Sequence, residues 1–214
     1  MDLGVHPLFL SVSAPARQPG NWVPTMDHRL LAWGRRRKTG LPALWLFTDS
    51  ARLPDPLPAI ARLPTGKAGV VFRHDSDPDR AVLGRAIAIL CRRRRLPLVV
   101  AGDAPLAAAL RAGVHLRGGR WPDSRRRGGI VTSSAHSLAD IRRARLAGAD
   151  LVFLSPVFPT RSHPGAPSLG PVRWVRMARS ARIPVAALGG IDGRSARALP
   201  VRFCAGAGAI TALA

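Results

Sequence analysis

The sequence predicts a (β/α)8 TIM barrel that extends from residue 41 to residue 214. Three observations favour this fold. Apolar runs of strand length recur eight times, and helix-like segments separate most of them. The runs are continuously apolar, which is typical of parallel strands that are buried on both faces. Polar side chains or glycines follow each run at once, as they do where the strand ends of a barrel build a site.

The expected strands and helices alternate along the chain. Strands are expected at residues 43–47, 68–72, 96–101, 113–116, 129–134, 151–154, 183–188 and 201–206. Helices are expected at residues 79–94, 106–111, 137–147, 172–181 and 193–199. Ser137 and Asp140 resemble a capping box at the start of the third of these helices. A doubly wound open sheet is the alternative arrangement of the same elements.

We expect the chain to form a single domain of ordinary size, because 214 residues with 47% hydrophobic content can bury one large core. We expect residues 1–40 to form an irregular basic N-terminal extension and residues 41–214 to form the barrel domain. No run reaches the roughly 18 apolar residues that span a membrane. Cys91 and Cys204 have neither metal-binding nor redox spacing. We therefore expect a cytoplasmic protein without a membrane-spanning segment.

The charge of the chain is strongly basic, but its pattern argues against nucleic acid as a partner. The formal net charge is +21, and 33 residues are lysine or arginine. The arginines are spread along the chain, and there is no tyrosine and only 5% aromatic content for stacking on bases. We interpret the charge as a solvated basic surface, and binding of a polyanion through this surface is the alternative. A homo-oligomer is compatible with this composition.

Candidate site residues lie where the expected strands end. Asp49, Arg73, Asp103, Arg117, Ser134, His136 and Thr160 follow or end successive strands. The seventh strand is followed by Gly189-Gly190, and Gly206-Ala207 with Gly208 is expected to form a second glycine loop after the eighth. Backbone N–H groups in such loops bind phosphate. The alternative interpretation is that these small residues only allow close packing between strand and helix.

Several segments resemble the thiamine phosphate synthase family, which also contains thiazole tautomerases. The similar pieces come in order from Leu44 to the end of the chain. They are "LWLFTD", "VVFR", "VVAGD", "GVHL", "SAHSLADIRRARLAGADLVFLSPVFPT" and "IPVAALGGID". The fifth piece is the most specific. Members that are synthases join a thiazole phosphate to hydroxymethylpyrimidine diphosphate and release diphosphate. Mg²⁺ and cationic side chains stabilise the negative charge of the diphosphate as it leaves.

The resemblance implies roles for individual residues of this chain. It implies phosphorylated small molecules as substrates, and Asp103 as a ligand of Mg²⁺. The residues implied in catalysis are Arg73, Ser134 and His136. Those implied in binding substrate or phosphate are Thr160, Arg161, His163, Gly189, Gly190, Gly206 and Ala207.

The departures from the family pattern fall on the side of the metal and the diphosphate. Residues 71–75 read Val-Phe-Arg-His-Asp where the family has Gln-x-Arg-Glu-Lys. Gly102 replaces an asparagine, Arg120 lies where a second metal aspartate is expected, and His163 stands nearest the place of a loop lysine. A single aspartate makes a weakened magnesium site. Arg117, Arg120 and Arg161 could supply the missing positive charge.

Three functions remain open from the sequence. The first is thiamine phosphate synthesis with a degenerate metal and diphosphate site. The second is proton transfer of the tautomerase kind, in which His136 acts as acid and base, since imidazole titrates near neutral pH. The third is a catalytically inactive, regulatory barrel that binds a phosphorylated ligand.

Overall fold

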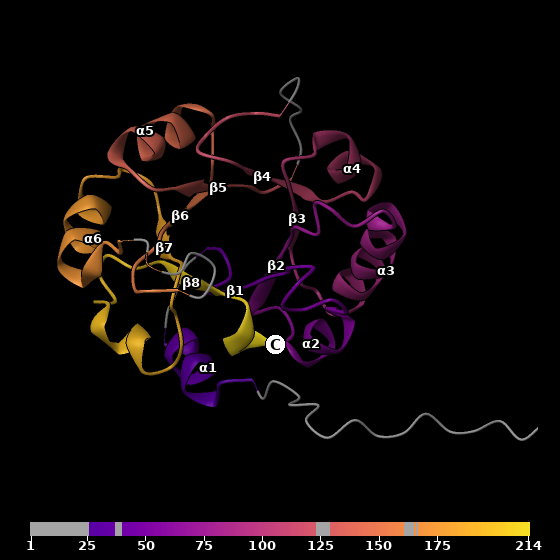
Figure 1. Ribbon diagram of the computed structural model, residues 1–214, viewed down its shortest axis with the longest axis horizontal. Helices are drawn as coiled ribbons and strands as arrows, with labels where there is room; N and C mark the ends of the chain where they lie inside the picture. The colour runs from indigo at the N-terminus through magenta and orange to yellow at the C-terminus, as the bar shows by residue number, and fades with distance from the viewer. Residues whose placement is uncertain (1–25, 37–39, 123–128, 161–164, 166) are drawn as a thin grey trace, which may run out of the picture.

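The computed structural model describes residues 26–36, 40–122, 129–160, 165 and 167–214. Eight parallel strands form a closed barrel in chain order (Figure 1). They are β1 (Leu44–Phe47), β2 (Ala68–Phe72), β3 (Leu98–Ala101), β4 (Gly113–Leu116), β5 (Val131–Ala135), β6 (Leu151–Leu154), β7 (Val185–Ala187) and β8 (Gly206–Ala209). Because β1 pairs with both β2 and β8, the predicted TIM barrel is confirmed and the open sheet is excluded.

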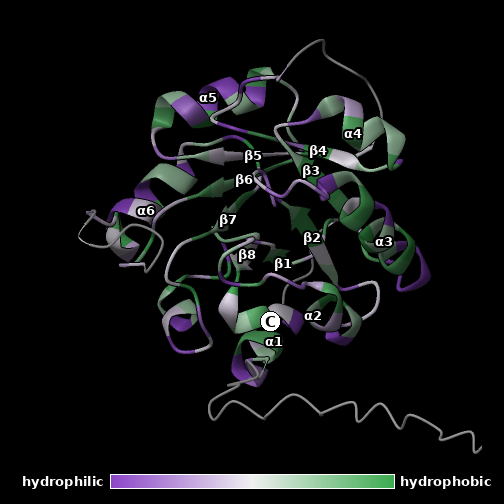
Figure 2. Ribbon diagram, turned by 45° about the vertical axis from the view of Figure 1, so that its right-hand side comes forward, coloured by the Kyte–Doolittle hydropathy of each residue, from purple (hydrophilic) through white to green (hydrophobic). Residues whose placement is uncertain are grey.

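Helices surround the barrel, as Figure 1 shows. They are α1 (His28–Arg35), α2 (Leu57–Arg62), α3 (Arg80–Arg93), α4 (Ala104–Ala109), α5 (Leu138–Leu146), α6 (Gly170–Arg179) and the 3₁₀ helices η1 (Ser195–Ala198) and η2 (Thr211–Leu213). The strands are largely hydrophobic, whereas the helices carry hydrophilic residues as well (Figure 2). Among the described residues, no helix combines the length and the apolar character needed to cross a membrane.

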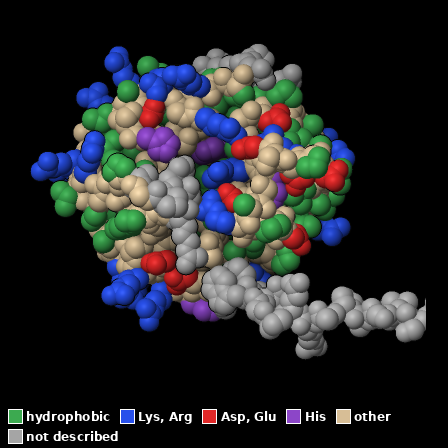
Figure 3. All heavy atoms as spheres, viewed as in Figure 1, with side chains coloured by type: hydrophobic (Ala, Val, Ile, Leu, Met, Phe, Trp, Pro, Cys, Tyr) green, Lys and Arg blue, Asp and Glu red, His purple; other side chains and the backbone are tan. Residues whose placement is uncertain are grey.

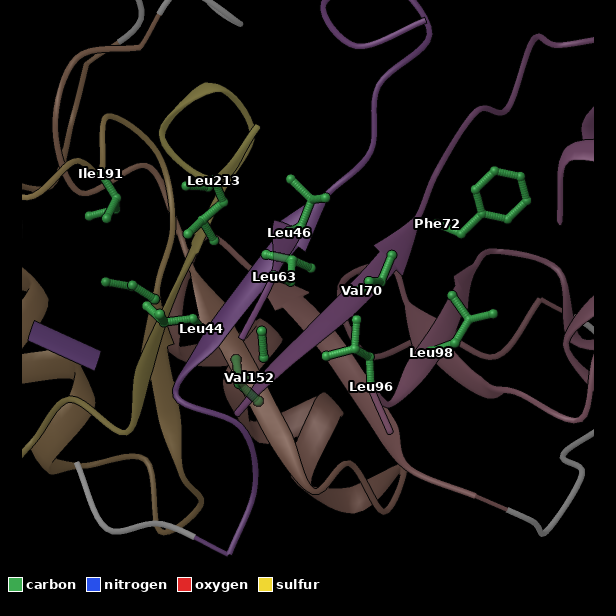
Figure 4. Packing of buried hydrophobic residues seen from close by; sticks show 14 of the residues in the cluster. Leu44, Leu46, Leu63, Val70, Phe72, Leu96, Leu98, Val152, Ile191 and Leu213 are labelled. Carbon is green, nitrogen blue, oxygen red and sulfur yellow. The ribbon is translucent and has the colours of Figure 1, made fainter. Parts of the chain in front are cut away.

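The core has two parts, one on each side of the strands. Inside the barrel, side chains such as Trp45, Phe47 and Phe153 pack together. Outside it, alternate residues of the same strands, including Leu44 and Leu46 of β1, pack against the helices (Figure 4). Successive residues of a strand point to opposite faces, so each strand contributes to both parts. This explains why most of the strands, such as β1, β2, β3 and β6, are continuous apolar runs in the sequence.

The prediction for the eighth strand is wrong by several residues. Residues 201–205 precede the strand, and β8 itself is the sequence Gly-Ala-Gly-Ala at Gly206–Ala209. Val201, expected inside a strand, is 60% exposed. The strand has no large side chain because the ring of Phe47 fills the space beside it: a Cβ on Gly208 would lie 2.5 Å from Cε2 of that ring.

The expected irregular extension contains a helix. Helix α1 begins after Asp27, whose Oδ1 accepts hydrogen bonds from the amides of Arg29 and Leu30 at 2.8 and 3.1 Å. Leu30 is fully buried, and the helix contacts η1. Helix α1 thus lies in the outer ring of helices, next to η1 (Figure 1). Residues 1–25 of the extension lie outside the described residues.

Replacing Leu30 by Ala should destabilise the whole barrel, because it removes a fully buried side chain of α1. We expect the free energy of unfolding in urea, followed by circular dichroism, to fall by about 2–5 kcal/mol. Leu146→Ala is the matched control: Leu146 is 66% exposed, and its loss should change stability by no more than about 0.5 kcal/mol. Equal stabilities of the two variants would contradict the placement of α1 against the barrel.

Candidate active site

The carboxyl ends of the eight strands form one rim, and the polar residues predicted from the sequence gather there. Figure 3 shows basic, acidic and histidine side chains near the centre of one face of the molecule. The rim has two halves. Arginine and aspartate side chains follow β1 to β4, and hydroxyl, imidazole and backbone amide groups follow β5 to β7.

Arg73 lies on the basic half of the rim, directly after β2. Its backbone amide donates to Thr48 Oγ1 at 3.0 Å, and its guanidinium Nη2 lies 4.0 Å from Asp49 Oδ2. Asp49 is bound more closely by Arg52, at 2.7 Å. The hydrogen bond from Arg52 is the main cause that lowers the pKa of Asp49. The Arg73 side chain is 39% exposed, so it can meet a ligand above the barrel.

His74, next to Arg73, belongs to the framework of the rim. It is buried, with Nδ1 2.9 Å from Thr48 Oγ1 and Nε2 3.2 Å from the carbonyl oxygen of Pro54. A carbonyl oxygen only accepts hydrogen bonds, so Nε2 donates to Pro54 and Nδ1 accepts from the hydroxyl of Thr48. His74 thereby ties the loop after β1 to the end of β2.

Asp103 does not have the surroundings of a metal ligand. Its Oδ1 caps α4 by accepting from the amide of Leu106 at 2.8 Å, and its Oδ2 accepts from Arg80 Nη1 at 2.8 Å. In the described part of the chain, no three His, Cys, Asp or Glu side chains gather in a way that could hold a metal ion. The weakened magnesium site predicted at Asp103 is not confirmed, and the side chains present do not fit one.

Ser134 and His136 lie on the other half of the rim. Ser134 is half-buried at the end of β5, and its hydroxyl accepts from the amide of Gly118 at 3.3 Å. His136 is exposed, and its Nδ1 lies 2.9 Å from the carbonyl oxygen of Ser155. Because that oxygen only accepts, Nδ1 carries the proton in the neutral ring, and Nε2 is the basic nitrogen.

The start of the helix that follows His136 holds the histidine backbone. The amide of Asp140 donates to Ser137 Oγ at 3.1 Å, so Ser137 caps the helix as predicted. The Asp140 carboxylate accepts from the amide of His136 at 2.9 Å, one residue before the position that a full capping box uses. Burial acts to raise the pKa of Asp140. The hydrogen bonds from His136 and Ser137 and the charge of Arg143 outweigh it, so the pKa is lowered.

The loops after β6 and β7 lie against each other. The amides of Val157 and Phe158 donate to the carbonyl oxygens of Leu188 and Gly189 at 2.9 and 3.1 Å. Gly189 and Gly190 have φ values of 90° and 64°, and a Cβ on Gly190 would lie 2.6 Å from the carbonyl oxygen of Pro159. Close packing alone therefore accounts for these two glycines.

The amides of Gly189 and Gly190 are the feature that packing does not explain. Among the residues that the structure describes, neither N–H group donates a hydrogen bond. Unpaired amides of successive residues form concave sites that bind anions. Thr160, which is half-buried, ends the described part of the loop after β6. The predicted ligands Arg161 and His163 lie outside the described residues.

The prediction of a second glycine loop, at residues 206–208, is wrong. Gly206 and Ala207 are residues of strand β8, where both are buried, and their backbone pairs with that of neighbouring strands. They cannot form a loop at the rim. Two rim residues were missed in turn: Arg80, on the first turn of α3, and Asp75, three residues after the end of β2. Nothing in the sequence separates Arg80 from the many surface arginines.

His115 lies inside the barrel, as expected of a core histidine. Its Nδ1 is 2.8 Å from Thr132 Oγ1, and its ring contacts Phe47 and Phe153. Burial lowers its pKa to about 3, and the positive charges of Arg73 and Arg117 add to this effect. The imidazole is therefore neutral at physiological pH.

The structure is a closed (β/α)8 barrel whose polar side chains gather at the carboxyl ends of the strands, where TIM-barrel enzymes have their active sites. The family model for thiamine monophosphate synthase, TMP-TENI, matches residues 54–213, and the chain belongs to this family. The family predicted from the sequence is confirmed.

Individual relatives agree with this membership. The bifunctional thiamine biosynthesis protein ThiED of Geobacter sulfurreducens is 34% identical over 157 residues, which are 69% of this chain and 32% of that protein. The putative thiamine-phosphate synthase 2 of Aquifex aeolicus is 33% identical over 160 residues, which are 71% of this chain and 86% of that protein. The chain thus spans about a third of the first relative and most of the second.

Solved structures are similar as well. The thiamine phosphate pyrophosphorylase of Pyrococcus furiosus has a TM-score of 0.66 at 26% identity, covering 78% of this chain and 85% of that one. FabK of Thermotoga maritima has a TM-score of 0.62 at 18% identity, covering 88% of this chain and 63% of that one, and shares the fold alone.

The buried His115 should make the barrel less stable in acid. Its ordinary pKa of 6.5 applies in the unfolded chain and falls to about 3 in the folded one. Between these values the unfolded state binds a proton that the folded state does not bind, so stability falls as pH decreases. We expect this residue to contribute a slope of about 1.4 kcal/mol per pH unit, measured by urea unfolding between pH 6 and 4.

His115→Asn is the control, since asparagine can donate to Thr132 without titrating. Aspartates also contribute to the pH dependence of stability in this range. The difference between the pH profiles of wild type and the variant gives the contribution of the histidine alone. Parallel pH profiles for the two proteins would contradict a neutral, buried His115.

Proposed function

We propose that this barrel makes thiamine phosphate from a thiazole phosphate and hydroxymethylpyrimidine diphosphate. The observation that carries the proposal is the division of one rim into an amide half and an arginine half. Gly189 and Gly190 offer unpaired N–H groups, and Arg73 and Arg117 lie after β2 and β4. Two phosphorylated substrates need two such anion sites within reach of each other. The family of the chain and the names of its relatives support this choice of substrates.

The phosphate of the thiazole substrate would bind at the loop after β7. The two amides donate to its oxygens, and the loop is held in shape by its own hydrogen bonds. Ser195 Oγ donates to the carbonyl oxygen of Gly190 at 2.9 Å, and Asp192 Oδ1 accepts from the amide of Ser195 at 2.7 Å. A site that is ordered before binding loses little conformational entropy when the ligand arrives.

The diphosphate of the pyrimidine substrate would bind on the arginine half. In the reaction a bond forms between the thiazole and the methylene carbon of the pyrimidine, and the bond from that carbon to the diphosphate oxygen breaks. Negative charge grows on the departing oxygen, and cationic donors fixed in place stabilise it. Arg73 and Arg117, whose side chains are 39% and 58% exposed, can serve as these donors.

A second candidate function is proton transfer within the thiazole ring system. The orientation of His136 favours it, because the hydrogen bond from Nδ1 to Ser155 leaves Nε2 as a base at the rim. Solvent deuterium entering the thiazole without release of diphosphate would favour this reaction. An inactive, ligand-binding barrel is the third candidate, and binding of thiazole phosphate without either reaction would favour it.

The proposal is tested by mixing the purified protein with both substrates, with and without Mg²⁺. We expect diphosphate and thiamine phosphate to appear in equal amounts. If neither product appears while thiazole phosphate still binds, the chain is not a synthase.

Gly190→Ala should abolish phosphate binding, because the added Cβ would lie 2.6 Å from the carbonyl oxygen of Pro159 and disturb both loops. We expect inorganic phosphate to raise the thermal midpoint of wild type and to leave that of the variant unchanged. Gly66→Ala is the matched control: Gly66 has a nearly equal φ of 65°, but nothing lies within 4 Å of its added Cβ. Phosphate that stabilises Gly190→Ala as much as Gly66→Ala would rule out this loop as the anion site.

Arg73→Gln should slow the release of diphosphate, because it removes a donor that stabilises the leaving group. We expect kcat to fall by about 100-fold in the steady-state assay. Arg145→Gln, on the exposed surface of α5, removes the same charge away from the rim and should keep the wild-type rate. Equal rates in the two variants would show that Arg73 has no part in catalysis.

A further inference from the structure

The guanidinium of Arg80 lies between two aspartates of the rim. Its Nη1 donates to Asp103 Oδ2 at 2.8 Å, and its Nη2 donates to the carbonyl oxygen of Ala101 at 2.8 Å. Nη2 also lies 3.4 Å from Asp75 Oδ1. The side chain is 16% exposed, and Cζ lies 5.6 Å from the centre of the Phe72 ring. Arg80 is therefore enclosed on several sides at the edge of the candidate site.

The other carboxylate oxygens of this cluster have donors as well. Asp103 Oδ1 accepts from the amide of Leu106 at 2.8 Å, and Asp75 Oδ2 is bound by Arg117 Nη2 at 2.6 Å. A magnesium ion needs carboxylate oxygens that are free to coordinate it. To bind here it would have to displace Arg80, and a largely buried guanidinium without its carboxylates is strongly unfavourable.

The same contacts position Arg117. Asp75 bridges Arg80 and Arg117, and the guanidinium of Arg117 lies over Gly102, where a Cβ would be only 3.0 Å from Arg117 Nε. The missing side chain of Gly102 thus makes room for an arginine. Arg80 keeps this arrangement even though its buried Nε has no hydrogen-bond partner among the described residues. The paired charges fix its position.

We propose that Arg80 is the resident cation of this rim and takes the place of a bound divalent ion. It is a positioning residue. Its guanidinium pairs with the Asp103 carboxylate, and through its contact with Asp75 it orients Arg117 toward an anionic ligand. That this ligand is a diphosphate group rests on the proposed function. The pairing of Arg80 with Asp103 and Asp75 is independent of the proposed function.

Binding of Mn²⁺ tests the cation without any substrate. Free Mn²⁺ is measured by its electron paramagnetic resonance signal in titrations of the full chain. Arg80→Gln frees one carboxylate oxygen of each aspartate, Asp103 Oδ2 and Asp75 Oδ1, and we expect its Mn²⁺ affinity to rise by about tenfold or more over wild type. Arg80→Lys keeps the charge and should stay close to wild type. The double variant R80Q/D103N should lose the gain.

Two outcomes would overturn the proposal. One is equal Mn²⁺ affinity of wild type and Arg80→Gln. The other is Mn²⁺ binding to wild type that Asp103→Asn abolishes, because Asp103 would then be a metal ligand in the presence of Arg80. The second comparison needs no Arg80 variant, so it decides the matter even if Arg80→Gln does not fold.

Binding of inorganic diphosphate in EDTA tests the ligand. We expect wild type to bind it without metal, and Arg80→Gln to bind about tenfold more weakly, because Arg117 is no longer held. Arg80→Lys should recover part of the affinity. Binding by wild type only when Mg²⁺ is added would overturn the role of Arg80. No diphosphate binding under either condition would defeat the proposed function, and the Mn²⁺ titrations would still decide what Arg80 does.

Discussion

The barrel depends on the way three aromatic rings fill its interior. Trp45 and Phe47 of β1 meet Phe153 of β6 edge to face, with ring centres 5.8 and 4.8 Å apart. The strands on both sides of β1 make room for these rings with glycine: a Cβ on Gly69 of β2 or on Gly208 of β8 would lie 2.5 Å from a ring carbon. Strand β1 can pair with both neighbours because they leave out these side chains. The closed sheet that results brings all the strand ends to one rim.

This constraint also explains how much of the fold the sequence could predict. The repeated apolar runs were enough to predict the barrel, and most strand positions, because most of the buried strands consist of apolar residues. Strand β8 is the exception. Its four residues are small because Phe47 occupies the space, so the apolar run at residues 201–206 was taken for the strand. Helix α1 was missed because its place beside η1 depends on contacts with distant residues, such as the hydrogen bond from the Gly193 amide to Asp27 Oδ2.

The sequence predicts where the candidate site lies, but it does not predict which side chains contact one another there. A residue that follows a barrel strand lies on the rim, and Arg73, Asp103, Ser134 and His136 were found in this way. Which side chain each one meets is decided across elements. The sequence predicts Asp103 as a metal ligand. In the structure its two oxygens accept hydrogen bonds from the amide of Leu106 in α4 and from Arg80 in α3. An arginine 23 positions away gives no sign of this contact in the sequence.

The residues that depart from the expected family pattern contact one another in the structure. By the resemblance described above, Asp75 lies where a lysine and Gly102 where an asparagine are expected, and Arg117 follows β4. In the structure these residues touch: Asp75 binds Arg117, Arg117 lies over Gly102, and Arg80 closes the cluster through Asp75 and Asp103. Had the site simply decayed, there would be no reason for the replacements to fit one another. Their mutual fit favours a rim in which positive charge is held in place by aspartates, an arrangement that needs little reorganisation when an anion binds.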